Sequence, residues 1–115
     1  MDIEALQKKL VKFAADRDWQ QYHSPKNLAM ALAAESGELL ELFQWLDESQ
    51  SRRLSAEQRD AAGLELVDIL FYLLQISHEL NIDLDAAVER KLAINAERYP
   101  VDLAKGNATK YDRRR

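Results

Sequence analysis

The chain has no cysteine and only three glycines and two prolines among its 115 residues. Without thiols there is no disulfide framework, no thiolate nucleophile and no cysteine-ligated zinc or iron–sulfur centre. Hairpin turns need glycine and proline, and no segment shows the sustained alternation of apolar and polar residues that marks a strand. The sequence therefore predicts an all-α protein.

Positive charge is also scarce. Lysine and arginine number 16 against 20 acidic residues, which gives a net charge of −4. Binding to the backbone of DNA or RNA needs a basic surface, and the one basic cluster here is the run of arginines at 113–115. No run reaches the roughly 18 apolar residues of a membrane span, and the first residues do not resemble a targeting leader. We expect a cytoplasmic protein with neither polymeric nucleic acid nor membrane as partner.

Helical spacing of apolar residues recurs in four segments. Ser24 and Pro25 form a helix start, and Ser55 with Gln58 has the spacing of a capping box. A fourth helix must end before Pro100, because the residue preceding a proline disfavours the α conformation. The expected helices span about 3–17, 25–46, 56–80 and 84–99. Short joints make neighbours antiparallel, so we predict a four-helix bundle in a domain of residues 1–100, followed by an irregular polar tail of residues 101–115.

The second and third predicted helices each carry a pair of acidic residues. Glu35 and Glu38 are three residues apart, as are Glu65 and Asp68, so each pair lies on one helical face. The third helix is apolar nearly all round, which is typical of a buried helix, and the second repeats this pattern less strongly. We therefore expect the acidic residues to face inward or into a cleft, although a solvated acidic face is the alternative interpretation.

Buried unpaired carboxylates cost several kcal/mol each, so something positive must offset them. Residues 27–51 and 60–89 contain no lysine or arginine, so neither helix supplies the charge within these stretches. A divalent cation is the simplest compensation, and oxygen ligands favour Mg²⁺, with Mn²⁺ as a possible substitute. A di-iron carboxylate bundle is disfavoured, because neither His23 nor His78 follows a glutamate by three residues.

Gly37 and Gly63 fall inside these two helices, where glycine costs about 1 kcal/mol relative to alanine. A close approach of another backbone or of a ligand would explain them, and chance placement is the alternative.

Several motifs between Phe13 and Tyr111 occur together in one known family. They are Arg17-Asp18-Trp19, Asn27-Leu28, Glu35-Ser-Gly-Glu38 continuing to Trp45, Glu65-Leu-Val-Asp68 continuing to Tyr72, and finally Lys91, Asn95, Arg98-Tyr99-Pro100 and Lys110-Tyr111. In these motifs the sequence resembles the MazG-like all-α nucleoside triphosphate pyrophosphohydrolases, and among them the dCTP pyrophosphatase branch. Two acidic pairs about 26 residues apart on long helices are the specific part of this match.

This resemblance implies hydrolysis of a nucleoside triphosphate to a monophosphate and pyrophosphate, with dCTP or a modified pyrimidine deoxynucleotide as substrate. It implies that Glu35, Glu38, Glu65 and Asp68 bind Mg²⁺ and that Glu35 and Glu38 are catalytic. Glu38 is the candidate general base, with ligation alone as its competing role. Broad nucleotide specificity, and a non-catalytic bundle that binds nucleotides or regulates, are the alternatives. The family also implies a homodimer or homotetramer.

Other residues are candidates for binding the substrate. A nucleobase can stack on Trp19 and Trp45, and its edge can bind His23 and Asn27, although core packing is the alternative for both tryptophans. Tyr72, one turn beyond Asp68, is the candidate for the sugar.

The phosphates are expected to meet basic and polar residues near the end of the chain. Lys91, Asn95 and Arg98 lie at spacings of four and three, so they share one helical face that can bind phosphates. An ordinary solvated face is the alternative interpretation. Lys110 is placed in a tail that either folds over the phosphates or stays free.

Overall fold

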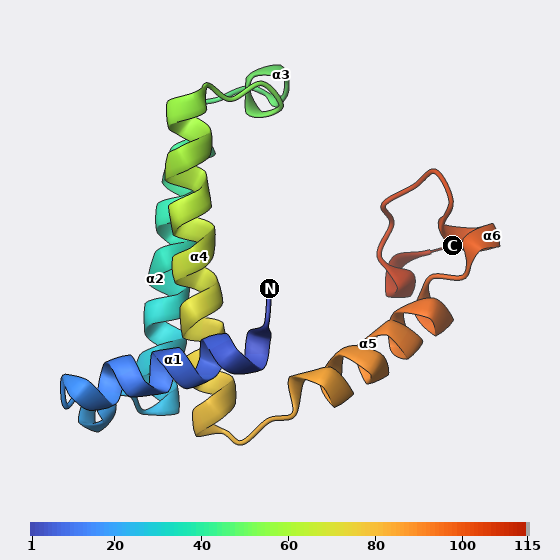
Figure 1. Ribbon diagram of the computed structural model, residues 1–115. Helices are drawn as coiled ribbons and strands as arrows, with labels where there is room; N and C mark the ends of the chain where they lie inside the picture. Colours follow the sequence, from blue (N-terminus) through green and yellow to red (C-terminus); the bar gives the residue numbers. More distant parts are fainter. Residues whose placement is uncertain (115) are drawn as a thin grey trace. The chain divides into compact units, whose positions relative to one another are not determined.

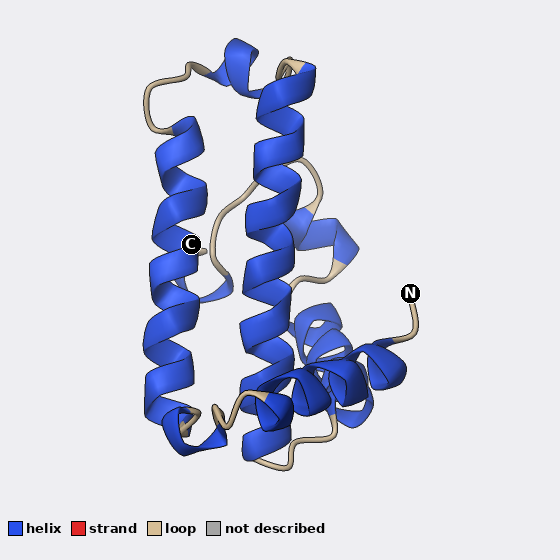
Figure 2. Ribbon diagram, turned by 60° about the vertical axis from the view of Figure 1, so that its left-hand side comes forward, coloured by secondary structure: helices blue, strands red, loops and turns tan. Residues whose placement is uncertain are grey.

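The computed structural model describes residues 1–114, and over that range it consists of helices and loops without a strand (Figures 1 and 2). The prediction of an all-α protein is confirmed. The chain divides into two compact units, one of residues 1–81 and one that begins at Ile82.

The first unit contains three long helices and two short ones. They are α1 (Ile3–Asp16), the 3-10 helix η1 (Gln20–Tyr22), α2 (Pro25–Phe43), α3 (Glu48–Ser51) and α4 (Ala56–Glu79). Figure 1 shows α2 and α4 side by side and running in opposite directions, with α1 packed across α4. This antiparallel pair determines which residues of the two acidic segments meet.

The predicted helix starts are present. Asp2 caps α1, and Ser24 accepts a hydrogen bond from the N–H of Asn27, the third residue of α2, with Pro25 as the first helical residue. At the start of α4, Ser55 accepts from the Gln58 N–H at 3.1 Å while the Gln58 side chain accepts from the Ser55 N–H at 2.9 Å. Each cap satisfies backbone donors that have no partner within the helix.

The loop between α2 and α4 differs from the prediction. Helix α2 ends at Phe43 instead of near Leu46, and a four-residue helix, α3, follows it. A capping box of Asp47 and Gln50 starts α3, with hydrogen bonds of 2.7 and 2.9 Å. The polar composition of this segment masked a local helix that its own side chains stabilise.

The buried core of the first unit is small and is formed by residues of α1, α2 and α4. Its buried apolar side chains are Leu10, Ala14, Leu28, Ala62 and Leu74. The Gln7 side chain on α1 donates to the Leu74 carbonyl at 2.8 Å and to the Ser77 hydroxyl at 3.1 Å, which ties α1 to α4.

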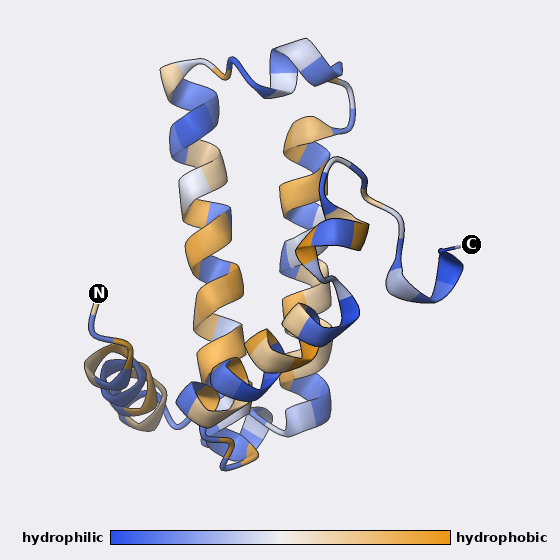
Figure 3. Ribbon diagram, turned by 90° about the vertical axis from the view of Figure 1, so that its right-hand side faces the viewer, coloured by the Kyte–Doolittle hydropathy of each residue, from blue (hydrophilic) through white to orange (hydrophobic). Residues whose placement is uncertain are grey.

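Helix α4 exposes much of its apolar surface. Figure 3 shows hydrophobic residues over most of this helix after its hydrophilic first turn. Leu64 is 65% exposed and Leu66 is 54% exposed. By length and composition α4 is apolar enough to cross a membrane, a property that the core helix of a packed domain shares. Because it packs against α1 and α2 and carries Glu65 and Asp68, we interpret it as the central helix of this unit.

The glycines inside α2 and α4 have no packing role within the chain. A Cβ added to Gly37 or Gly63 would meet nothing within 4 Å. The expectation of a close backbone approach is therefore wrong for contacts within the described residues.

The second unit contains α5 (Leu84–Arg98), α6 (Val101–Ala104) and the 3-10 helix η2 (Tyr111–Arg113). The sequence predicted an irregular tail, but the tail contains two short helices and its residues interact with the end of α5. Tyr111 packs edge-on against Tyr99 with ring centroids 6.0 Å apart, and the Arg98 guanidinium lies 4.3 Å from the centre of the Tyr111 ring. These aromatic and cation–π contacts hold the segment in place.

Candidate active site

Three of the four predicted acidic residues form a cluster between α2 and α4. Glu35 and Glu38 lie one turn apart on α2, and Glu65 faces them from α4. One carboxylate oxygen from each of the three lies within 4.8 Å of the others. Each pair's helical spacing and the antiparallel packing of the two helices together produce this arrangement.

The cluster contains polar atoms that the protein leaves unsatisfied. Glu35 Oε2 and Glu65 Oε2 are buried and have no hydrogen-bond partner among residues 1–114. The ion pairs found in residues 1–114 join Lys8 to Glu4 and Lys12 to Asp16, all on α1, so within these residues no basic side chain forms an ion pair with the cluster. Buried carboxylate oxygens without hydrogen-bond partners, in a cluster whose possible ligands are all oxygens, suit a hard divalent cation.

The crowding of negative charge raises the pKa of Glu35 to about 7. The largest cause is the closeness of the Glu65 and then the Glu38 carboxylate, each of which can accept a hydrogen bond from Glu35 only while Glu35 keeps its proton. Burial and the negative charges of Glu38 and Asp68 follow. A carboxyl group that keeps its proton near neutral pH relieves repulsion among its neighbours. A proton on Glu35 thus takes the place that a cation would fill.

Asp68 lies beside the cluster and is not among the three residues whose oxygens converge. It follows Glu65 by one turn and lines the same cleft as Glu35. Its charge contributes to the raised pKa values of both Glu35 and Tyr72. Asp68 is therefore electrostatically part of the site, and its position suits a second ligand position or the approach of substrate.

A cleft of about 450 Å³ opens next to the carboxylates. It brings together three of the predicted substrate-binding residues, Trp19, His23 and Tyr72, with Glu35 and Asp68. Burial, and then the charges of the nearby carboxylates, raise the pKa of Tyr72, so its hydroxyl remains a hydrogen-bond donor. A cleft of this size with an acidic end and aromatic walls has the composition of a small-molecule site.

Sequence reasoning missed part of the wall of this cleft. The additional lining residues are Leu6, Lys9, Leu10 and Phe13 of α1, and Phe71 and Gln75 of α4. The apolar stripe of α1 was a visible signal, but it has the same spacing as a stripe that only packs in a core. The sequence pointed less clearly to Gln75 as a lining residue. The available sign was that it is a polar residue seven positions after Asp68 in an apolar helix.

Two predicted residues of the base pocket do not line the cleft. The Asn27 side chain donates to the Tyr22 carbonyl at 3.0 Å and so supports the turn before α2. Trp45 follows the end of α2 and is 86% exposed. Neither tryptophan is in the core, because Trp19 is 44% exposed and packs edge-on against Phe13, with ring centroids 5.7 Å apart.

The predicted phosphate-binding residues belong to the second unit. Lys91, Asn95 and Arg98 all lie on α5, which places them on one helical face, and Lys110 directly precedes η2. All four are exposed.

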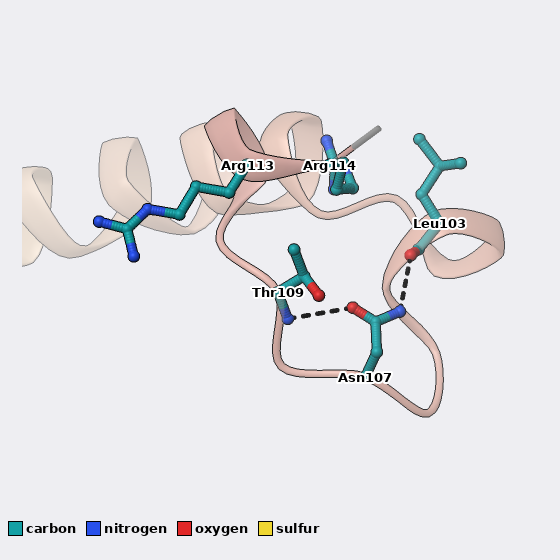
Figure 4. Close-up of a pocket in the computed structure, with 5 residues that line it drawn as sticks. All are labelled: Leu103, Asn107, Thr109, Arg113 and Arg114. Carbon is teal, nitrogen blue, oxygen red and sulfur yellow. Dashed lines mark hydrogen bonds between the residues drawn. The ribbon is translucent and has the colours of Figure 1, made fainter.

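A second hollow of about 510 Å³ lies within the tail of this unit (Figure 4). Its lining residues are Leu103, Asn107, Thr109, Arg113 and Arg114. The Asn107 side chain donates to the Leu103 carbonyl at 3.0 Å and accepts from the Thr109 N–H at 3.1 Å, which shapes the loop. In Figure 4 the Arg113 side chain points away from Asn107 and Thr109.

Comparison with known proteins gives consistent matches. Residues 30–113 match the MazG-like family. The dCTP pyrophosphatase 1 of Rattus norvegicus is 41% identical over 111 residues, which cover 95% of this chain and 65% of that protein. The Bos taurus protein of the same name is 43% identical, with 66% of its length covered. The chain thus spans about two thirds of these relatives.

A solved structure is also similar. It is a pyrophosphatase from Archaeoglobus fulgidus, with a TM-score of 0.81 and 35% sequence identity. The match covers 87% of this chain and 94% of that one.

Proposed function

Since this chain belongs to the MazG-like family, we propose that it hydrolyses a deoxynucleoside triphosphate, dCTP or a modified pyrimidine form, to the monophosphate and pyrophosphate. The observation that carries this proposal is the convergence of Glu35, Glu38 and Glu65 next to a cleft of about 450 Å³ that Glu35 itself lines. The relatives named dCTP pyrophosphatase 1 and the similar pyrophosphatase structure support the same reaction. Removal of damaged or excess nucleotides in the cytoplasm would be its role.

The proposed cofactor is Mg²⁺, with Mn²⁺ as a substitute. Glu35, Glu38 and Glu65 would hold the ion and Asp68 would complete the set, because their oxygens are the ligands that both metals accept. When bound, the ion supplies neutralisation of the triphosphate's charge and polarisation of the phosphorus under attack.

The protein's own residues would position the water and the leaving group. We assign Glu38, which is exposed at the edge of the cluster, the role of accepting a proton from the attacking water, and Glu35 the role of orienting it. Lys91, Asn95 and Arg98 would donate to the phosphates from one face of α5, and Lys110 would reach them from the tail. The pyrophosphate leaves with its charge compensated by these donors.

The base and sugar would occupy the apolar part of the cleft. Trp19 offers a face for stacking, His23 a polar edge, and Tyr72 a contact for the sugar that a 2′-hydroxyl would crowd. Asn27 and Trp45 retain a proposed role only if substrate or another subunit brings them to the base.

We propose that the working protein is a homodimer or homotetramer in which residues 1–100 complete a four-helix bundle and residues 101–115 form a closing tail. Large apolar side chains outside the core support this, among them Met30, Leu40 and Leu64, each at least 60% exposed. A single chain that leaves such surface in water gains much by covering it with a second copy.

Pyrophosphate release from a panel of nucleoside and deoxynucleoside triphosphates, with Mg²⁺ and with a chelator, tests the function. We expect metal-dependent release that is fastest with dCTP. Glu38→Gln should abolish turnover while circular dichroism shows intact helices, and Lys8→Gln on α1 is the matched surface control. Release from all triphosphates alike would indicate broad specificity, and binding without release would indicate a regulatory bundle.

A further inference from the structure

Gln75 lies in line with residues of the proposed site. Asp68, Tyr72 and Gln75 are at spacings of four and three on α4, so they share one face of the helix, and all three line the 450 Å³ cleft. At 1.5 Å per residue, Gln75 is about 10 Å along the helix from Asp68. The row therefore runs from an acidic group, through a phenol, to an amide.

The Gln75 side chain has an unused hydrogen-bonding group. Its Oε1 is buried and has no partner among the described residues. By contrast, the Gln7 side chain on α1 uses its amide to donate to the Leu74 carbonyl and the Ser77 hydroxyl. A buried amide oxygen without a partner is unfavourable, so a ligand that donates to it gains affinity.

The surroundings of this amide suit an aromatic ring with a polar edge. Most of the cleft wall is apolar or aromatic, formed by Leu6, Leu10, Phe13, Trp19 and Phe71, while Lys9, His23 and Tyr72 are its other polar residues away from the carboxylates. In such walls an amide that can both donate and accept adds directional selectivity, because apolar contacts alone discriminate weakly between rings of similar size.

We propose that Gln75 determines base specificity by binding the hydrogen-bonding edge of the substrate's nucleobase. Its side-chain carbonyl accepts from an exocyclic amino group, and its amide NH₂ donates to the adjacent ring nitrogen, a pairing that cytosine offers at N4 and N3. This inference rests on the proposed function, since it places the triphosphate at the carboxylates and the base two helical turns away.

The test removes each side of this contact in turn. The substrates are dCTP and its analogue without the 4-amino group, 2-pyrimidinone deoxynucleoside triphosphate, with base-free deoxyribose triphosphate as reference. We expect the unaltered protein to prefer dCTP over the analogue by about five- to a hundredfold in kcat/KM, the range set by one unsatisfied buried hydrogen bond. Gln75→Met, similar in size but unable to pair, should erase that preference and leave the base-free substrate unaffected.

Two controls separate specificity from folding. Gln7→Met should lower the melting temperature, because it removes the α1–α4 hydrogen bonds, yet keep the preference for dCTP. If Gln75→Met unfolds, Gln75→Leu replaces it. An unchanged dCTP preference in a folded Gln75 variant overturns the inference.

Failure of the proposed function gives a different result. If the unaltered protein releases no pyrophosphate, binding of dCMP and of its 4-deamino analogue is measured by calorimetry instead. Loss of discrimination in Gln75→Met then supports the contact without hydrolysis, and equal binding of the two monophosphates by the unaltered protein refutes it.

Discussion

Cation binding to this protein should release protons from Glu35. Its pKa of about 7 in the cation-free protein results from the crowding of Glu65, Glu38 and Asp68 around it. A cation that binds these carboxylates must displace any proton they hold, because ligating oxygens bind as the ionised form.

The size of the effect follows from that pKa. At pH 7 Glu35 is half protonated, so Mg²⁺ binding should release about 0.5 proton per site, rising to about 0.9 at pH 6 and falling to about 0.1 at pH 8. The apparent affinity for Mg²⁺ should accordingly fall about tenfold from pH 8 to pH 6.

Titration calorimetry in two buffers of different ionisation enthalpy measures this release directly. Glu35→Gln carries no titrating proton and should show almost none at any of the three pH values. Glu48→Gln, on the short helix α3, is the matched control and should behave like the unaltered protein. Proton release that does not vary between pH 6 and pH 8 would refute the assignment of the raised pKa to Glu35.

Three further predictions concern stability and assembly. In the metal-free protein, the raised pKa of Glu35 means that the folded state holds the proton more tightly than the unfolded state does. The stability of the unaltered protein relative to Glu35→Gln should therefore fall as the pH rises from 4.5 to 7 and level off above pH 7. A difference in melting temperature between the two proteins that stays constant with pH would contradict this. Gly63→Ala should raise the free energy of unfolding by up to about 1 kcal/mol, since its Cβ meets nothing within the chain, and a loss of stability would instead reveal a subunit contact there. Leu64→Glu should shift the oligomer toward monomer in sedimentation velocity, and an unaltered profile would exclude this face from the interface.

Local signals predicted the helices well because their causes are local. Ser24 with Pro25, and Ser55 with Gln58, satisfy backbone donors within three or four residues, so the sequence alone reveals where α2 and α4 begin. The end of α2 and the short α3 were less visible. Their boundaries depend on how the chain turns between two packed helices, which the local composition does not specify.

In the candidate site, too, the features with local causes were predictable and those that depend on packing were not. The spacing of the acidic pairs indicated a cluster, but the membership of Glu65 and the outlying place of Asp68 depend on the pairing of α2 with α4. The contribution of α1 to the cleft was hidden because a wall-lining stripe and a core-packing stripe have the same spacing. Trp45, an aromatic residue expected in the pocket or the core, proved exposed.

The carboxylate cluster lies between α2 and α4, the two most closely packed helices of the first unit. Between α2 and α4 the fully buried apolar side chains are few, and Glu35 and Glu65 face each other across the pair with like charges when ionised. A cation that binds both therefore replaces a repulsion with a shared ligand. Because it binds the folded pair and not the separated helices, it stabilises the fold in proportion to the logarithm of its concentration above its Kd. Binding chemistry and fold stability thus depend on the same three side chains.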